Sequence, residues 1–186
     1  GMRGAVEKAR EIEASDKKAV ILGQFDNAAN PEAHYRTTGP EIYRDTDGKI
    51  DFFVAGVGTG GTLSGAGKFL KERVPGIKII AVEPASSPLL KTGKAGAHDI
   101  QGIGANFVPA TLDKSVYDEI AEITDEEAYR CARMTGKLEG FLSGISSGAA
   151  LAAALKNAAL PQNEGSTTVV VFPDGGDRYM STPLFD

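Results

Sequence analysis

One stretch of the chain, residues 51–62, joins three patterns that together constrain the fold: a short apolar strand, a glycine-rich turn and the start of a helix. It reads DFFVAGVGTGGT, and an amphipathic segment follows over residues 63–74. Glycine lets the backbone adopt positive φ and approach a ligand closely, while the unpaired N–H groups and the dipole at a helix start favour an anion. The stretch therefore predicts a phosphate-binding turn between a strand and a helix.

The glycine spacing alone leaves the ligand open. No Gly-Lys-Ser/Thr follows the turn, which excludes a nucleoside-triphosphate P-loop. Gly56, Gly58 and Gly61 do match the dinucleotide pattern, and Glu83 ends the next apolar run about twenty residues later, where such sites place an acidic residue. A tight turn that binds nothing is the third interpretation.

Strand and helix patterns alternate along the chain. Apolar strand patterns occur at 19–22, 52–55, 77–82, 118–123 and 167–172, and helical patterns at 2–14, 32–45, 63–74, 124–137 and 144–157. The alternation predicts an α/β fold with a mostly parallel sheet flanked by helices and right-handed crossovers. The segment 85–115 has little regular pattern and is predicted to line or cover a site, with disorder as the alternative.

Polar residues follow several of the predicted strands. Gln24 and Asn27 come after the first apolar run, and ligands in open α/β sheets sit beyond the carboxyl ends of strands. Turn chemistry is the alternative for Asn27, and Asn30 before Pro31 is interpreted as a helix cap. The glycine- and serine-rich turn at 143–148 offers either a second anion site or only a cap with tight packing.

Composition narrows the class of protein. Apolar residues make up 41% and charged residues 24%, and the net charge of −5 is spread without a basic stripe, which argues against a nucleic-acid partner. No apolar run reaches membrane-spanning length and the first residues lack a signal-peptide core, so a cytoplasmic protein is predicted. Cys131 is predicted to fill the core, and His34 and His98 to be solvated, with no metal site.

Six motifs in a fixed order carry a resemblance to a known family. They are QFDNAANP at 24–31, TTGPEI at 37–42, GVGTGGT at 56–62, IQGIG at 100–104, GISSGA at 144–149 and RYMST at 178–182. Together they resemble the cysteine synthase (O-acetylserine sulfhydrylase) and cystathionine β-synthase family of pyridoxal-phosphate enzymes. The six matches cover nearly all of the chain and are far more specific than the glycine turn alone.

The resemblance implies a fold like the tryptophan synthase β-subunit (fold type II), with the cofactor pyridoxal 5'-phosphate between two α/β domains. Residues 1–27 would then be a remnant of the smaller N-terminal domain, whose remainder is missing, and residues 28–186 the larger C-terminal domain. The cofactor phosphate is expected at Gly58, Thr59, Gly60, Gly61 and Thr62. Gln24 and Gly102 are expected near the substrate.

The same resemblance implies a reaction and partners. The reaction is β-replacement, a transferase or lyase chemistry in which O-acetylserine loses acetate and sulfide adds to give cysteine. The substrates are thus a small amino acid and sulfide, with homocysteine as an open alternative acceptor. A homodimer is expected, and serine acetyltransferase is a possible partner.

Two departures from the family pattern bear on activity. The family attaches its cofactor to a lysine in a Ser-x-Lys-x-Arg context, and no lysine here has that context. The chain is therefore expected to resemble the C-terminal part of such an enzyme and to be inactive alone. The family also often has a hydroxyl residue after the proline of the last strand, whereas Asp174 follows Pro173 here. Asp174 is therefore expected to contact the pyridine nitrogen, with a water molecule as the alternative.

Two other classes of function compete with a synthase. A non-catalytic module that binds a phosphorylated ligand or a partner would explain the absent lysine. An NAD-dependent dehydrogenase would use Gly56, Gly58, Gly61 and Glu83, but it leaves the other five motifs unexplained.

Overall fold

A computed structural model describes residues 2–186 and shows a four-stranded parallel sheet. The strands are β1 (Phe52–Gly56), β2 (Lys78–Pro84), β3 (Glu119–Ile123) and β4 (Thr168–Val170), in the spatial order β3-β2-β1-β4. β1 lies at the centre, with Val54 opposite Ile80 of β2 and Val170 of β4. The predicted α/β fold with a parallel sheet is confirmed. Its carboxyl edge brings together the segments that follow all four strands.

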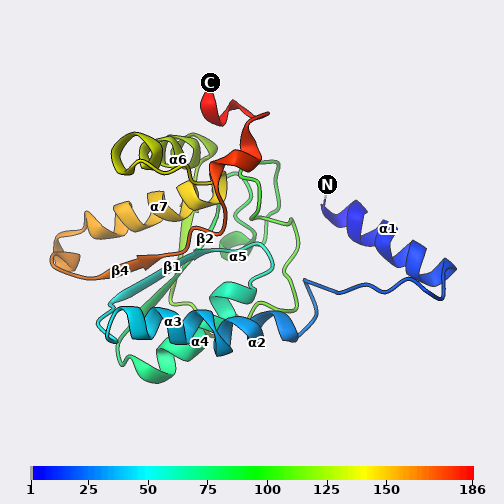
Figure 1. Cartoon of the computed structure of the whole chain (residues 1–186), viewed down its shortest axis with the longest axis horizontal. Helices are drawn as coiled ribbons and strands as arrows, with labels where there is room; N and C mark the ends of the chain where they lie inside the picture. Colours follow the sequence, from blue (N-terminus) through cyan, green and yellow to red (C-terminus); the bar gives the residue numbers. More distant parts are fainter. Residues whose placement is uncertain (1) are drawn as a thin grey trace.

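Helices cover both faces of this sheet (Figure 1). On one face lie α2 (Ala29–Arg36), α3 (Thr38–Asp45) and α4 (Gly61–Arg73), and on the other α6 (Asp125–Glu139) and α7 (Ile145–Ala158). The short α5 (Leu89–Thr92) follows β2, and 3-10 turns occupy Pro161–Asn163, Gly176–Tyr179 and Pro183–Phe185. The helical pattern at 32–45 is divided at Thr37 in the structure, since α2 ends at Arg36 and α3 begins at Thr38.

The two core clusters follow from the strand alternation. Phe53 and Ala55 of β1 face α4, whereas Val54 faces α6 and α7, because successive side chains in a strand point to opposite faces. The amphipathic segment predicted at 63–74 is confirmed as helix α4, and its apolar residues Leu63, Ala66, Leu70 and Val74 are all buried. The sheet is therefore held between two separate apolar layers.

The contact between α6 and α7 is close and rich in small residues. Thr124 and Glu127 form a capping box at the start of α6, each bonding the other's backbone. A side chain at Gly148 would collide with Ala128 O of α6, so glycine is needed where the helices meet. Cys131 is buried in this contact, as predicted, and burial raises the pKa of its thiol.

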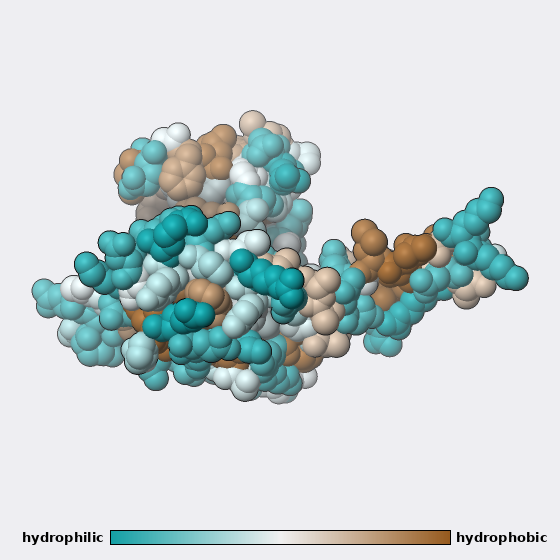
Figure 2. Space-filling view, turned by 60° about the horizontal axis from the view of Figure 1, so that its bottom comes forward, coloured by the Kyte–Doolittle hydropathy of each residue, from teal (hydrophilic) through white to brown (hydrophobic). Residues whose placement is uncertain are grey.

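The N-terminal helix differs from the rest of the molecule. Helix α1 (Met2–Ser15) has no buried residue and projects from the body (Figure 1). The strand predicted at 19–22 is wrong: this segment is irregular, and Val20 and Leu22 are 79% and 83% exposed. A strand needs a neighbour to take its backbone hydrogen bonds, and none lies beside it within residues 2–186. Figure 2 shows apolar surface gathered on this projecting part.

No helix in residues 2–186 combines the length and apolar character needed to cross a bilayer.

The predicted division between residues 1–27 and 28–186 stays a prediction. Contacts across this division already involve Gln24, whose carbonyl accepts from Asn30 Nδ2 at 2.8 Å. They also involve Phe25, whose carbonyl accepts from Thr111 N at 3.1 Å and whose ring lies 4.9 Å from that of Phe107.

Candidate active site

A small pocket of about 170 Å³ lies at the carboxyl end of β1. Its lining comes from four places: the glycine turn after β1, the 102–103 segment, the start of α7 and the end of β4. The residues are Ala55, Gly56, Gly58, Thr59, Gly60, Thr62, Gly102, Ile103, Ser146, Val171 and Pro173. Five of the expected site residues, Gly58, Thr59, Gly60, Thr62 and Gly102, are thus brought together.

The turn leaves its backbone donors free. A side chain at Gly58 would collide with Gly102 O, and Gly60 has φ +80 with Leu112 Cβ only 2.7 Å from where a Cβ would lie. Within residues 2–186, the N–H groups of Gly58, Thr59 and Gly60 donate to no carbonyl. Such a run of free N–H groups before a helix start binds an anion.

Helix α2 supports both threonines of the turn. Thr59 Oγ1 accepts from Asn30 Nδ2 at 3.0 Å and from Gly61 N at 3.2 Å. Thr62 Oγ1 lies 3.1 Å from Nε2 of His34, one helical turn after Asn30. The pocket-lining hydroxyls are therefore anchored from behind.

Gly61 has a different role from its neighbours in the turn. It starts α4, and a side chain there would collide with the Asn30 side chain. Gly65, one turn later, lies against Pro31 O and His34 Cβ in the same way. These two glycines let α2 approach α4 closely, so Gly61 contributes packing beside the pocket and does not line it.

Three predictions about polar residues are wrong here. Asn30 is not a cap: Ala28 is the N-cap of α2, and the Asn30 amide instead joins Gln24 O at 2.8 Å to Thr59. His34 is not solvated, since Thr38 and Thr62 hold both its ring nitrogens and partial burial lowers its pKa. His98 Nε2 donates to Gly104 O at 2.8 Å. Sequence spacing carried no signal for Thr59 and Thr62 as partners, because they are 29 and 28 residues from Asn30 and His34, nor for Gly104, which lies in an irregular loop.

The second glycine-rich turn, before α7, uses most of its polar groups internally. Gly144 N donates to Asp174 O at 3.0 Å, and Ser143 Oγ pairs with Thr135 Oγ1 at 2.9 Å. Ser146 differs because it lines the pocket, is 3% exposed and makes no hydrogen bond to another described side chain. Sequence reasoning missed Ser146; its place next to the start of α7 was the available signal.

Asp174 lies beside the pocket but does not line it. Its Oδ2 accepts from the Tyr179 hydroxyl at 2.6 Å, and its Oδ1 lies against Gly144. Burial, followed by this bond to Asp174, strongly raises the pKa of Tyr179. Asp174 as the group at the pyridine nitrogen stays a prediction.

A protein-family model described as pyridoxal-phosphate dependent enzyme matches residues 1–174. The chain belongs to this family. It is 49% identical over 185 residues to cysteine synthase from Staphylococcus aureus strain Mu50, covering 99% of this chain and 59% of that protein. It is 51% identical over 197 aligned residues to cysteine synthase A from Escherichia coli K12, covering 100% of this chain and 60% of that protein.

The fold agrees with that of a solved cysteine synthase. The crystal structure of cysteine synthase from Entamoeba histolytica matches with a TM-score of 0.94 at 46% identity, covering 100% of this chain and 55% of that one. The resemblance and the fold type inferred from the six motifs are therefore confirmed. The chain spans 59% of the length of the S. aureus relative.

The family's cofactor fits this pocket. Free N–H groups at Gly58, Thr59 and Gly60, with two threonine hydroxyls, form a donor set suited to a phosphate. A side chain at Gly58 would collide with Gly102 O, which explains why only backbone lines the pocket at this position. The apolar side chains of Ile103 and Val171 and the hydroxyl of Ser146 suit an aromatic ring with a polar edge.

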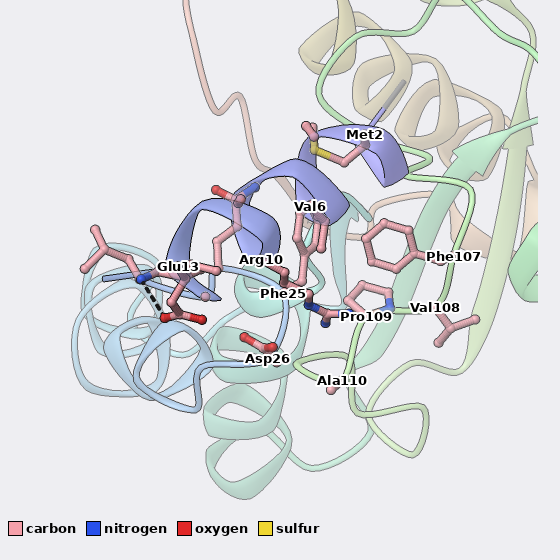
Figure 3. Close-up of a pocket in the computed structure, with 16 residues that line it drawn as sticks. Met2, Val6, Arg10, Glu13, Phe25, Asp26, Phe107, Val108, Pro109 and Ala110 are labelled. Carbon is pink, nitrogen blue, oxygen red and sulfur yellow. Dashed lines mark hydrogen bonds between the residues drawn. The ribbon is translucent and has the colours of Figure 1, made fainter. Parts of the chain in front are cut away.

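Gln24 does not line this pocket. Its side chain is exposed and lines a groove of about 700 Å³ between α1 and the segment 107–110. Figure 3 shows Met2, Val6 and Arg10 of α1 across this groove from Phe25 and Phe107. A substrate role for Gln24 and for Gly102 stays a prediction, although only Gly102 lines the pocket.

Glu83 has a structural role, because it holds the start of α5. Its buried carboxylate accepts from Leu90 N at 2.7 Å and Lys91 N at 3.1 Å at the start of α5. Burial raises its pKa. The carboxylate that a dinucleotide site needs is thus already bonded, which removes the support for a dehydrogenase.

Across residues 2–186 there is no cluster of three or more His, Cys, Asp or Glu residues suited to a metal ion.

Proposed function

We propose that this chain forms the cofactor-binding part of a cysteine synthase-like β-replacement enzyme. The observation that carries the proposal is the pocket at the end of β1, where free backbone donors, Thr59, Thr62 and Ser146 converge. The identity to cysteine synthases over nearly the whole chain supports it.

Each part of the pocket has a separate task in this proposal. The N–H groups of Gly58, Thr59 and Gly60 and the hydroxyls of Thr59 and Thr62 hold the phosphate. Ser146 faces the ring and offers a hydroxyl to its nitrogen, a role for which its position in the lining favours it over Asp174. Pyridoxal phosphate, when bound, supplies the electron sink for chemistry at the amino-acid carbons.

The substrates we propose are O-acetylserine and sulfide, with cysteine and acetate as products. Gly102 supports this by placing its backbone at the pocket, where φ +96 requires glycine and Ser146 Oγ lies 3.2 Å from where a Cβ would be. A substrate bound beside the cofactor would contact this segment. The exposed Gln24 would have to move toward the pocket to share in that contact.

No lysine is among the pocket-lining residues of the described chain. A covalent anchor for the cofactor cannot be replaced by another polar side chain, because only an amine forms the carbon–nitrogen double bond with the aldehyde. We therefore propose that this polypeptide alone binds the cofactor non-covalently and does not turn over O-acetylserine.

The test combines a binding measurement with a trapping measurement. The purified chain is titrated with pyridoxal phosphate while its absorbance spectrum is recorded, then treated with borohydride and mapped by mass spectrometry. Saturable binding without a specifically labelled lysine is expected, together with no cysteine formed from O-acetylserine and sulfide. One lysine labelled at full yield, with turnover, would contradict the proposed inactivity; absent binding would contradict the proposed site.

A second candidate is a non-catalytic module of the same fold that binds a phosphorylated ligand or a partner. The lysine-free lining of the pocket favours it. The two candidates separate when a peptide or domain carrying the family's lysine is added: recovered turnover supports the enzyme part, and binding without any recovery supports the module.

Assembly and location complete the proposal. Leu138, Phe141 and Leu155 line an apolar hollow of about 290 Å³ at the ends of α6 and α7 and are at least 44% exposed. Large exposed apolar patches are usually covered by association, which supports a homodimer. A cytoplasmic location and contact with serine acetyltransferase belong to the same proposal. Light scattering that shows a monodisperse monomer would contradict the dimer.

A further inference from the structure

We infer that His34 is a positioning residue that turns the Thr62 hydroxyl proton into the pocket. The inference deepens the proposed function and rests on it, since it assigns the phosphate of the cofactor as the acceptor of the hydrogen bond from the Thr62 hydroxyl. His34 itself does not line the pocket. It acts only through Thr62.

The geometry links three side chains in a row. His34 Nδ1 lies 2.9 Å from Thr38 Oγ1, and its Nε2 lies 3.1 Å from Thr62 Oγ1. Thr38 begins α3, His34 belongs to α2, and Thr62 is the second residue of α4. The imidazole therefore joins three helices at the point where α4 meets the pocket.

The direction of this chain of bonds decides what Thr62 offers. A neutral imidazole donates from one nitrogen and accepts at the other. If Nε2 carries the proton, it donates to Thr62 Oγ1, and the Thr62 hydroxyl is free to donate to an anion in the pocket. If Nδ1 carries the proton, Thr62 must donate to Nε2, and only its oxygen faces the pocket.

One observation favours the first arrangement, and a second allows it. Thr38 is a hydroxyl and can donate to an unprotonated Nδ1, so it satisfies the Nε2–H form, although it can also accept from Nδ1–H. The neighbouring Thr59 already has the equivalent arrangement, because the Asn30 amide and Gly61 N both donate to its oxygen. Asn30 and His34 are four residues apart on α2, so one helix face would direct both hydroxyls toward the pocket.

The ring is also placed to stay neutral and fixed. Partial burial lowers the pKa of His34 below its ordinary value. Gly65 of α4 packs against His34 Cβ, so a side chain at residue 65 would displace the ring. A neutral ring with both nitrogens bonded has one favoured tautomer once an anion is bound.

The first experiment reads the tautomer directly. The chain has two histidines, so a long-range proton–nitrogen correlation spectrum resolves both rings with little ambiguity. With saturating inorganic phosphate or pyridoxal phosphate, we expect the Nε2–H form at His34. His98, which donates from Nε2 to Gly104 O, is the internal control and should not change on addition. A Nδ1–H form at His34 with anion bound would overturn the inference.

The second experiment measures dissociation constants for pyridoxal phosphate and, as a control without the phosphate, pyridoxal. Thr62→Val should weaken pyridoxal phosphate binding about tenfold, the loss expected for one hydrogen bond to a charged group. His34→Phe should do the same, and the double variant should be no weaker than Thr62→Val. His34→Gln, whose amide can donate from near the Nε2 position, should bind like the wild type. Pyridoxal affinity should not change.

A purely structural role for His34 predicts different results. It would lower the urea midpoint of His34→Phe and weaken pyridoxal and pyridoxal phosphate alike, independently of Thr62. His98→Gln is the matched control for losing an imidazole. If the wild type binds pyridoxal phosphate and His34→Phe binds it equally well, only this inference fails. If the wild type binds neither phosphate nor pyridoxal phosphate, the proposed function fails with it.

Discussion

The two glycine-rich turns of this protein look alike in sequence and behave differently in structure. Both precede a helix, and both mix glycines with hydroxyl residues. The turn after β1 keeps its N–H groups free and directs Thr59 and Thr62 at a pocket. The turn before α7 bonds Gly144 N to Asp174 O and Ser143 to Thr135, leaving only Ser146 at the pocket.

The difference lies in what surrounds each turn. The first is supported from behind by α2, so its own donors are not needed to hold the chain. The second joins α6, α7 and the segment after β4, and its donors hold those three together. A glycine turn thus becomes a binding site when a neighbouring element takes over its structural bonds.

The largest expected effect is on stability, in the helix that follows the second turn. Gly148→Ala places a methyl group against Ala128 O and within 2.7 Å of Ala132 Cβ. Forcing α6 and α7 apart should lower the free energy of unfolding by about 3 kcal/mol. Urea unfolding checks this. A variant that kept its stability but lost pyridoxal phosphate binding would contradict the structural role given to the second turn.

The matching change in the first turn should act on binding. Gly58→Ala collides with Gly102 O and displaces the free N–H groups. Pyridoxal phosphate affinity should fall about a hundredfold, because more than one hydrogen bond to a charged group is lost. Stability should fall by only about 1 kcal/mol. Fluorescence titration beside urea unfolding measures both, and a larger stability loss than affinity loss would count against the distinction.

Tyr179→Phe tests the Asp174 side of the second turn and carries a pH signature. Losing the bond to Asp174 should cost about 2 kcal/mol, since it leaves a partly buried carboxylate oxygen without a donor. Burial and this bond raise the pKa of Tyr179, so the native state holds the proton more tightly than the unfolded chain. The stability that the protonated Tyr179 contributes is therefore present below about pH 10 and is lost as the pH rises above it.

The measurement is the difference in unfolding free energy between the wild type and Tyr179→Phe from pH 8 to 11. It should be constant up to about pH 10 and shrink beyond that. The other four tyrosines are the same in both proteins, so the difference isolates the effect of residue 179. A difference that grew with pH would show that the pKa of Tyr179 is lowered on folding, contrary to this prediction.

The smallest expected effects distinguish the roles of two serines in the second turn. Ser143→Ala breaks a buried hydroxyl pair and should cost about 1 kcal/mol of stability with no effect on binding. Ser146→Ala removes a hydroxyl that faces the pocket, so stability should change by about 0.5 kcal/mol or less. Its pyridoxal phosphate affinity should drop several-fold. Equal behaviour of the two serine variants would remove Ser146 from the site.

Much of this could be predicted from sequence, for local reasons. The strand alternation around Phe53, the stripe of α4 and the Thr124–Glu127 cap depend on residues close together in the chain, and all three are present in the structure. The glycine turn was identifiable because positive φ and free N–H groups leave a compositional trace.

The features that could not be predicted from sequence depend on contacts between distant segments. His34 and Thr62 are 28 residues apart, and Asn30 and Thr59 are 29 apart. Nothing in their local patterns distinguishes them from solvated or capping residues. The strand predicted at 19–22 failed for the related reason that an apolar run becomes a strand only beside a partner.

Cys131 gives the molecule a built-in reporter. It is the chain's one cysteine and lies 3% exposed in the contact between α6 and α7. A thiol reagent can reach it only when those helices separate, so its labelling rate counts opening events. Loss of the second turn's hydrogen bonds would speed labelling, whereas ligand binding at the first turn would slow it only if the two turns open together.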